Sequence, residues 1–182
     1  MNYLPPVLQA VLAVVVFIAA YFDFRWRRIP NWLVLSGLLV GIALNAFLYE
    51  WAGLRGSLEG LGLGLLIYLP LYALRGMGAG DVKLMAAVGA LVGWRNWIGV
   101  FMLTAITGGL VALLLVVLRG RARSTMANVG SMFQQMAHLQ APYAGNPELD
   151  VKNPKAVTLP HGVMIAVGSI EFLIAAALWA PR

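Results

Sequence analysis

Two aspartates and a run of alternating glycines are the residues of this sequence best suited to chemistry. Residues 76–83 are Gly-Met-Gly-Ala-Gly-Asp-Val-Lys, so Asp81 follows three glycines within an otherwise apolar stretch. Asp23 directly follows another long apolar run. Two carboxylates held close together can share one proton, so that the ionised one takes a proton from water and the protonated one polarises a peptide carbonyl. This is the chemistry of aspartic proteolysis, and Asp23 and Asp81 are the predicted catalytic pair.

The glycines before Asp81 can serve the same site. Glycine has no Cβ, so Gly76, Gly78 and Gly80 would let another backbone, such as that of an extended substrate, approach closely. Asp81 is expected at the N-terminus of the following helix, where the helix dipole favours an anion. The competing interpretation is a plain turn between two helices, with Asp81 as the N-cap residue. The sequence leaves both interpretations open.

The composition indicates which elements must position this pair. Hydrophobic residues make up 61% of the 182 residues and charged residues 11%, against about 45–50% and 25% in soluble domains. We therefore expect an all-α, polytopic membrane helix bundle that forms a single transmembrane domain over residues 1–182. Since a span needs about 20 apolar residues, about six are predicted. They are Leu4–Phe22, Asn31–Tyr49, Ser57–Leu74, Lys83–Trp94, Trp97–Leu118 and Leu159–Trp179. The first is longer than a signal-peptide core and is expected to be retained.

The distribution of positive charge predicts an orientation. Cytoplasmic connections of membrane proteins carry an excess of Lys and Arg. With both termini outside, every Lys and Arg except Arg55, Arg95 and Arg182 falls on the cytoplasmic side. The tryptophans predicted at the outer interface are Trp51, Trp94, Trp97 and Trp179, and those at the inner interface are Trp26 and Trp32. Asp23 and Asp81 are then expected in the same, cytoplasmic leaflet.

The fourth predicted span, Lys83–Trp94, is short. At about 1.5 Å per residue it is about 18 Å long, whereas the hydrocarbon core is about 30 Å thick. If Trp94 lies at the outer interface, Asp81 is expected below the cytoplasmic face, within the membrane plane. A helix that continues through Arg95 would remove this expectation.

Two further features have open roles. The cytoplasmic loop over residues 119–158 contains apolar residues near helical spacing, which indicates a possible amphipathic helix on the membrane surface. That helix would be either a connector or a surface that contacts a partner. Glu171 lies in the middle of the last span and needs an internal partner, through either a structural hydrogen bond or a functional role.

The segments around the two aspartates resemble a known family. Residues 23–32 (DFRWRRIPNW) and 76–94 (GMGAGDVKLMAAVGALVGW) resemble type IV prepilin peptidases, membrane aspartic endopeptidases with a Gly-x-Gly-Asp motif. The resemblance covers about residues 10–118, and residues 159–168 (LPHGVMIAVG) are similar to the family's Pro-x-Gly final helix. The short chain is most similar to the small enzymes of tight-adherence (Flp-type) pilus systems.

The resemblance implies roles for individual residues. It implies that Asp23 and Asp81 are catalytic, and Gly78 and Gly80 match the motif glycines. Lys83 matches a lysine that often follows the motif, and it would hold a carboxylate or a substrate carbonyl, or simply extend to the membrane interface.

The resemblance also implies a substrate and a location. The substrate would be a prepilin or pseudopilin, cut at the cytoplasmic face of a bacterial inner membrane, with no cofactor. Larger family members carry N-methyltransferase activity and a domain with a cysteine zinc site. This chain has no cysteine, so we predict a peptidase without methyltransferase activity.

Other functions stay open. A transporter or channel subunit would show broken helices, charges at mid-membrane and repeated halves. A non-catalytic membrane component of a pilus or secretion system would not need two facing aspartates. No nucleic-acid partner is expected despite a pI of about 10.1, because the positive charge follows the topology. His138 and His161 are isolated in the sequence, so no metal site is expected, and the oligomeric state is not predicted.

Overall fold

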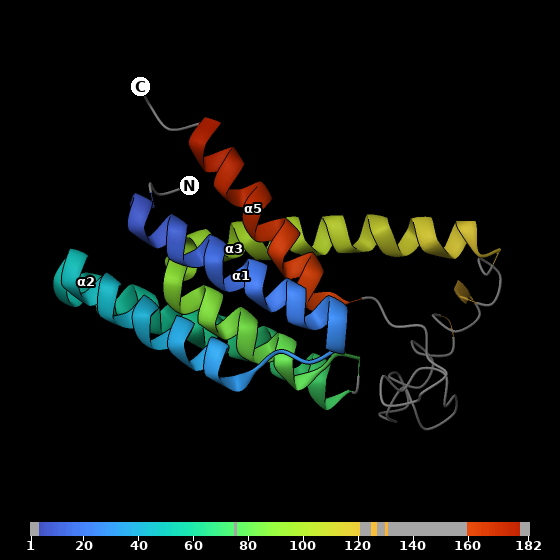
Figure 1. Ribbon diagram of the computed structural model, residues 1–182, viewed down its shortest axis with the longest axis horizontal. Helices are drawn as coiled ribbons and strands as arrows, with labels where there is room; N and C mark the ends of the chain where they lie inside the picture. Colours follow the sequence, from blue (N-terminus) through green and yellow to red (C-terminus); the bar gives the residue numbers. More distant parts are fainter. Residues whose placement is uncertain (1–3, 75, 121–124, 127–129, 131–159, 179–182) are drawn as a thin grey trace.

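Four long helices account for most of the described residues in the computed structural model (Figure 1). The structure describes residues 4–74, 76–120, 125–126, 130 and 160–178. The helices are α1 (Pro6–Trp26), α2 (Asn31–Ala73), α3 (Ala79–Leu118) and α5 (His161–Leu178). Each is long and apolar enough to cross a membrane, and the all-α prediction is confirmed for this part of the chain. Most of the predicted loop at 119–158, including its possible amphipathic helix, lies outside the described residues.

α2 and α3 each contain one residue at which the chain reverses direction (Figure 1). Glu50 in α2 has φ 53° and ψ −135°, and Gly93 in α3 has φ 73° and ψ 164°. Trp97 Nε1 donates a hydrogen bond to the carbonyl of Met85 at 3.0 Å, which joins the two halves of α3 across the reversal. The halves of α2 and α3 correspond to the second to fifth segments expected from the sequence.

The predicted end of the first span was wrong. α1 continues to Trp26, so Asp23 lies in the last turn of this helix rather than after a span that ends at Phe22. Likewise, the segment 50–56 was expected to be a connection, yet the helix resumes directly after Glu50. A helix ends where its backbone hydrogen bonds end, and these continue beyond the last apolar residue of a run.

The predicted start of the fourth span was also wrong. α3 begins at Ala79 rather than Lys83, so Asp81 lies within its first turn. The N-cap position belongs to Gly78, not to Asp81. From Ala79 to the reversal the helix is still only about 21 Å long at about 1.5 Å per residue, so the short span expected here remains short.

Trp97 is not an interfacial residue, contrary to the sequence prediction. Its side chain is 0% exposed. Its ring is stacked on Phe101 with 5.3 Å between centroids and lies 6.4 Å from the ring of Tyr68. Hydropathy places a tryptophan along the helix axis but does not say which way the side chain faces, and this one faces the bundle interior.

α2 and α3 share the most extensive helix contact in the fold. A Cβ on Gly60 would collide with the carbonyl of Gly89, and the reverse also holds. Small residues allow such close backbone contact, which is how helices associate where lipid surrounds them. Asn45 and Ser57, one from each half of α2, both donate to the carbonyl of Ala90, at 3.1 Å and 2.6 Å. These bonds satisfy a backbone acceptor close to the reversal in α3.

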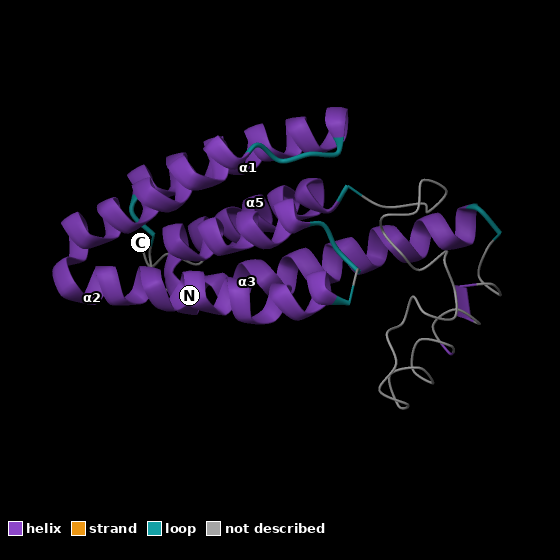
Figure 2. Ribbon diagram, turned by 90° about the horizontal axis from the view of Figure 1, so that it is seen from below, coloured by secondary structure: helices purple, strands orange, loops and turns teal. Residues whose placement is uncertain are grey.

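The bundle has two distinct ends. Figure 1 shows the end of α1 and the starts of α2, α3 and α5 together at one end, with the reversals of α2 and α3 at the other. Figure 2 shows the helices running lengthwise between these ends. We call the first of them the aspartate end, because Asp23 lies in the last turn of α1 and Asp81 in the first turn of α3.

Candidate active site

Asp23 is held against the N-terminus of α5. Its side chain is 7% exposed, and its Oδ2 accepts the backbone N–H of Gly162 at 2.8 Å. The backbone amide of Val163 also interacts with this carboxylate, and Arg27 lies within electrostatic range. The first turn of a helix presents N–H groups without intrahelical partners and carries the positive end of the helix dipole. This surrounding suits an ionised carboxylate.

The contact depends on the absence of a side chain at Gly162. A Cβ there would lie 3.0 Å from Asp23 Oδ2 and 3.1 Å from Ile29 Cδ1. The resemblance to the Pro-x-Gly helix included this glycine, but the predicted site did not. The structure makes Gly162 the backbone donor that positions the carboxylate.

Asp81 lies in the first turn of α3, where its side chain is half-buried. Its Oδ2 accepts the backbone N–H of Gly78 at 3.3 Å. It lies within electrostatic range of both Asp23 and Tyr68. The two aspartates singled out in the sequence are therefore neighbours at the aspartate end of the bundle.

Ile29 packs against both α3, which carries Asp81, and the start of α5, which binds Asp23. A Cβ on Gly80 of α3 would lie 3.3 Å from Ile29 Cβ, and one on Gly162 of α5 would lie 3.1 Å from Ile29 Cδ1. Ile29 belongs to the connection between Trp26, the end of α1, and Asn31, the start of α2. It was not predicted as a site residue, and its only sequence signal was its place in the segment 23–32.

Lys83 and Gly76 make other contacts. Lys83 is exposed, and its Nζ donates to Asn31 Oδ1 at 3.0 Å, which joins α3 to the start of α2. Gly76 is also exposed, and the nearest atom to a Cβ there would be the carbonyl oxygen of Leu71 at 3.5 Å. The roles in substrate binding expected of Lys83 and of the motif glycines stay predictions.

Tyr68 and His161 were not among the predicted site residues. Tyr68 is 2% exposed, and its ring lies 6.0 Å from that of Phe101 and 6.1 Å from that of His161. The Nε2 atom of His161 is buried and has no hydrogen-bond partner among the described residues. His161 was considered only as a metal ligand, because nothing in the sequence links it to Tyr68 or to the aspartates.

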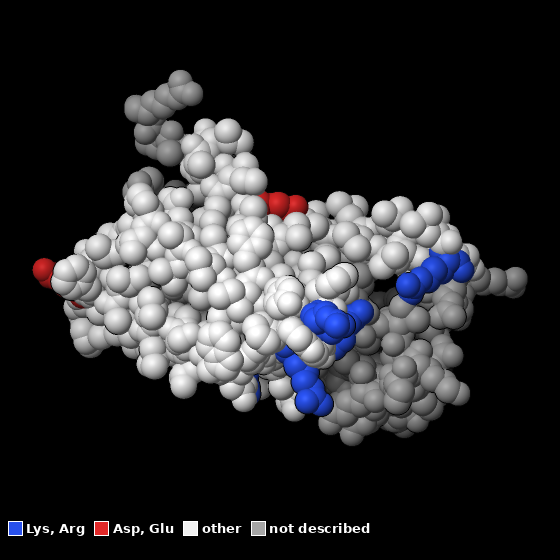
Figure 3. Space-filling view, viewed as in Figure 1, with Lys and Arg blue, Asp and Glu red and all other residues white. Residues whose placement is uncertain are grey.

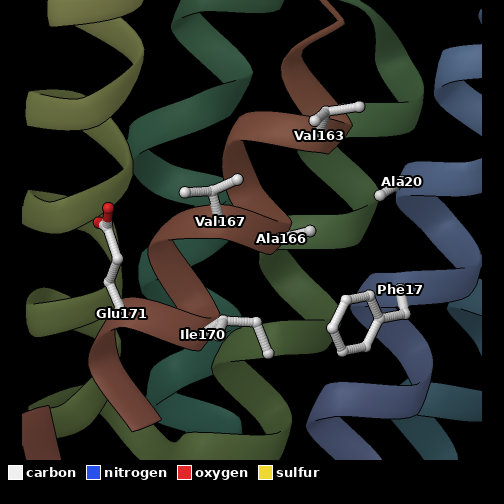
Figure 4. A pocket seen from close by; sticks show the side chains of 7 residues that line it. All are labelled: Phe17, Ala20, Val163, Ala166, Val167, Ile170 and Glu171. Atoms are coloured by element: carbon white, nitrogen blue, oxygen red, sulfur yellow. The ribbon is translucent and has the colours of Figure 1, made fainter. Parts of the chain in front are cut away.

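Glu171 has an internal partner, as expected for an acid in the middle of a span. Thr107 Oγ1 donates to its carboxylate, with 2.8 Å and 3.0 Å to the two oxygens. Glu171 lines a cavity of about 300 Å³ (Figure 4). The other lining residues are Phe17, Ala20, Val163, Ala166, Val167 and Ile170. The hydrogen bond favours the structural role over the functional one.

The chemistry available at the aspartate end is that of carboxylates. Within the described residues, no group of three or more His, Cys, Asp or Glu side chains could hold a metal ion. Asp23 receives backbone donors from a helix N-terminus, whereas Asp81 receives a single, longer bond from Gly78. Two neighbouring carboxylates in unequal surroundings can divide the roles of base and acid between them.

Fold and site together define a helical membrane protein with a pair of acidic side chains at one end of its bundle. The family comparison is more specific. Residues 10–113, more than half of the chain, match the type IV leader peptidase family. The chain belongs to this family, which confirms the resemblance found in its sequence.

Several curated relatives are named prepilin leader peptidase/N-methyltransferase. Those of Myxococcus xanthus (strain DK1622), Legionella pneumophila and Pseudomonas putida are each 31% identical to the chain, over 110, 131 and 115 residues. The alignments cover 57%, 68% and 59% of this chain, and 32%, 45% and 40% of the relatives. The chain thus spans less than half the length of these relatives. No solved structure matches it significantly.

Proposed function

We propose that this chain is an aspartic endopeptidase that removes the leader peptide of prepilin-like proteins. The observation that carries the proposal is the juxtaposition of Asp23 and Asp81 in a chain of the type IV leader peptidase family. The names of the curated relatives support the substrate class.

The two carboxylates take different roles in the proposed reaction. Asp23, which accepts the amide of Gly162 at 2.8 Å, is the ionised partner and takes a proton from a water molecule. Asp81 is the protonated partner and donates its proton to the oxygen of the scissile carbonyl as the water oxygen attacks the carbon. When the tetrahedral intermediate collapses, the C–N bond breaks, Asp23 gives its proton to the leaving amine, and Asp81 takes a proton back from a hydroxyl of the intermediate, which becomes the new carboxyl group. The pair titrates as a unit.

We also propose that the aspartate end faces the cytoplasm of a bacterial-type inner membrane. In this arrangement each half of α2 and α3 crosses the bilayer, which makes six spans with both termini outside. In Figure 3 the visible Lys and Arg side chains lie near the aspartate end and over the end of α3, and an acidic group lies at the opposite end of the bundle. This asymmetry agrees with the positive-inside rule, and large exposed apolar side chains such as Phe17, Leu66 and Leu110 suit contact with lipid.

This location suits a substrate with an apolar helix. Such a helix stays in the lipid while the extended junction with the leader reaches the carboxylates near the cytoplasmic face. A prepilin of a tight-adherence (Flp-type) pilus is the specific substrate we propose. We retain the prediction that the chain adds no methyl group, which the mass of the new N-terminus of a cleaved prepilin will test.

The deciding experiment is cleavage of a prepilin in liposomes by the unsubstituted chain and by Asp23→Asn and Asp81→Asn. Each substitution is expected to lower the rate by about 1,000-fold or more, because neither carboxylate can replace the other. Asn can still accept the hydrogen bond of Gly162 or Gly78, so thermal stability should change little. Glu59→Gln is the matched control, because Glu59 pairs with Arg55 on the surface, at 2.8 Å, and belongs to no part of the proposed site.

Three results would contradict the proposal. Full activity in either Asn variant would show that the two aspartates do not act as a catalytic pair. Transport that depends on the two aspartates, without any cleavage, would favour the transporter or channel alternative. If the chain showed neither cleavage nor transport, a non-catalytic membrane component would be favoured.

A further inference from the structure

His161 presents a buried polar atom that has no hydrogen-bond partner in the part of the chain that the structure describes. Among the described residues, two buried side-chain atoms lack a hydrogen-bond partner, His161 Nε2 and Thr104 Oγ1. Leaving such a group unpaired is destabilising, so each such atom in a native protein needs an explanation. For His161 its position suggests one.

The imidazole lies where the surroundings of the two aspartates meet. His161 opens α5 and directly precedes Gly162, whose amide binds Asp23. Its ring is 6.1 Å from the ring of Tyr68, and Tyr68 is within electrostatic range of Asp81. His161 is thus adjacent in the chain to the residue that binds Asp23, and its ring contacts a residue within electrostatic range of Asp81.

The ring is held in place by its neighbours. Tyr68 packs against Trp97 and Phe101 as well as His161, and Trp97 is fixed by its hydrogen bond to the Met85 carbonyl at 3.0 Å. A polar group that is oriented by packing in this way is well suited to bind one ligand atom.

We propose that His161 Nε2 hydrogen-bonds the main chain of the substrate beside the scissile bond. The inference rests on the proposed function, since it needs a peptide between Asp23 and Asp81. An extended peptide offers both C=O and N–H groups, and an imidazole nitrogen can pair with either, depending on which ring nitrogen carries the proton. Because Nε2 is buried in the free protein, the peptide reaches it when the side chains over it move aside, and the bond that the described residues leave unmade is then made in the enzyme–substrate complex.

Thr104 provides the matched control. It carries the other unpartnered buried atom and also lies in the α3–α5 contact, where a Cβ on Gly168 would lie 2.7 Å from Thr104 Cα. Gly168 is about 10 Å further along α5 than His161, at about 1.5 Å per residue. Thr104 thus resembles His161 in carrying a buried polar atom without a partner among the described residues, but it lies away from the aspartates.

The experiment compares His161→Leu, His161→Gln and Thr104→Val with the unsubstituted chain, by prepilin cleavage kinetics and by thermal unfolding in the same detergent. His161→Leu is expected to lower kcat/KM about 10- to 100-fold, the loss of one hydrogen bond in a desolvated site. His161→Gln should regain most of this activity, because its amide can reach the position of Nε2. Thr104→Val should cleave at the original rate. The melting temperatures of His161→Leu and Thr104→Val should equal or exceed the original, since each substitution removes an unpaired polar atom.

The possible outcomes separate this inference from the proposed function. If His161→Leu cleaves as fast as Thr104→Val, or His161→Gln loses as much activity as His161→Leu, the inference is overturned and the peptidase stands. If His161→Leu fails to fold, the comparison of His161→Gln with Thr104→Val decides, and a loss of more than about tenfold in the Gln variant overturns the inference. If the unsubstituted chain cleaves no prepilin, the proposed function fails and this inference fails with it.

Discussion

At the scale of single residues, the position of Asp23 is set by a residue that has no side chain. Gly162 donates its amide at 2.8 Å and leaves room for the carboxylate and for Ile29. In the proposed reaction the geometry at Asp23 decides how well water is activated, because a displacement of about 1 Å can cost a hundredfold in rate. The site is therefore expected to be sensitive at Gly162 as well as at the aspartates.

Gly162→Ala is expected to lower prepilin cleavage by at least about tenfold. The new Cβ would lie 3.0 Å from Asp23 Oδ2, which is closer than van der Waals contact, so the carboxylate must move. Crowding of this kind costs about 1–3 kcal/mol of stability, measured by thermal unfolding. Gly109→Ala is the control, because a Cβ there meets nothing within 4 Å. Equal activity in the two variants would show that Gly162 does not position Asp23.

Glu171 is expected to act through its hydrogen bond and not through its charge. Glu171→Gln can still accept from Thr107, so cleavage and melting temperature should stay close to those of the unsubstituted chain. Glu171→Leu would leave the Thr107 hydroxyl unpaired and should lower stability by about 1–2 kcal/mol. A loss of cleavage in the Gln variant at unchanged stability would instead establish a functional role for the charge.

At the scale of the elements, the reversals and the glycine contacts bring the site together. α3 carries Asp81 and packs on α2 through backbone contact at Gly60 and Gly89. The two halves of α2 both donate hydrogen bonds to the Ala90 carbonyl of α3. The helix that bears Asp81 is thus held by close packing at small residues and by hydrogen bonds from buried polar groups. These are the interactions that hold helices together in lipid.

Gly60→Ala is expected to lower the free energy of unfolding by about 2–3 kcal/mol, because the Cβ would collide with the Gly89 carbonyl and force α2 and α3 apart. Gly62→Ala, two residues further along the same helix, meets nothing within 4 Å and should be neutral or slightly stabilising. Thermal unfolding in detergent compares the two. Equal stability of the two variants would mean that α2 and α3 do not cross as closely as described.

At the scale of the whole molecule, the two ends of the bundle differ in charge and in content. The aspartate end holds the candidate site, and the Lys and Arg side chains visible in Figure 3 lie near it and over the end of α3. The opposite end holds the reversals at Glu50 and Gly93. If the positive-inside rule applies, the site faces the cytoplasm, where a prepilin still carries its leader.

This orientation can be tested with single cysteines, because the sequence contains none. Glu50→Cys, at the exposed reversal of α2, should react with a membrane-impermeant maleimide added outside intact spheroplasts. Arg28→Cys, in the exposed α1–α2 connection, should react only after the membrane is opened. The reverse pattern would place the aspartate end outside and contradict cleavage at the cytoplasmic face.

Much of the fold and part of the site could be predicted from the sequence alone. The long apolar runs indicated helices because backbone polar groups in lipid must be paired within the chain. Asp23 and Asp81 stood out because the predicted topology put both in the same leaflet, and two close carboxylates can share a proton. The helices were predicted from composition averaged over each run, and the aspartates from their residue type and position in the chain. Neither prediction needed a tertiary contact.

The tertiary structure alone decided which side chains meet. Gly162 and Asp23 are 139 residues apart, and no local pattern pairs them. Trp97 was expected at the interface and is buried, and His161 was dismissed as isolated yet lies beside Tyr68. Hydropathy gives the place of a residue along a helix. Its partners depend on how that helix is rotated and which helices pack against it, and these are set by contacts between residues remote in sequence.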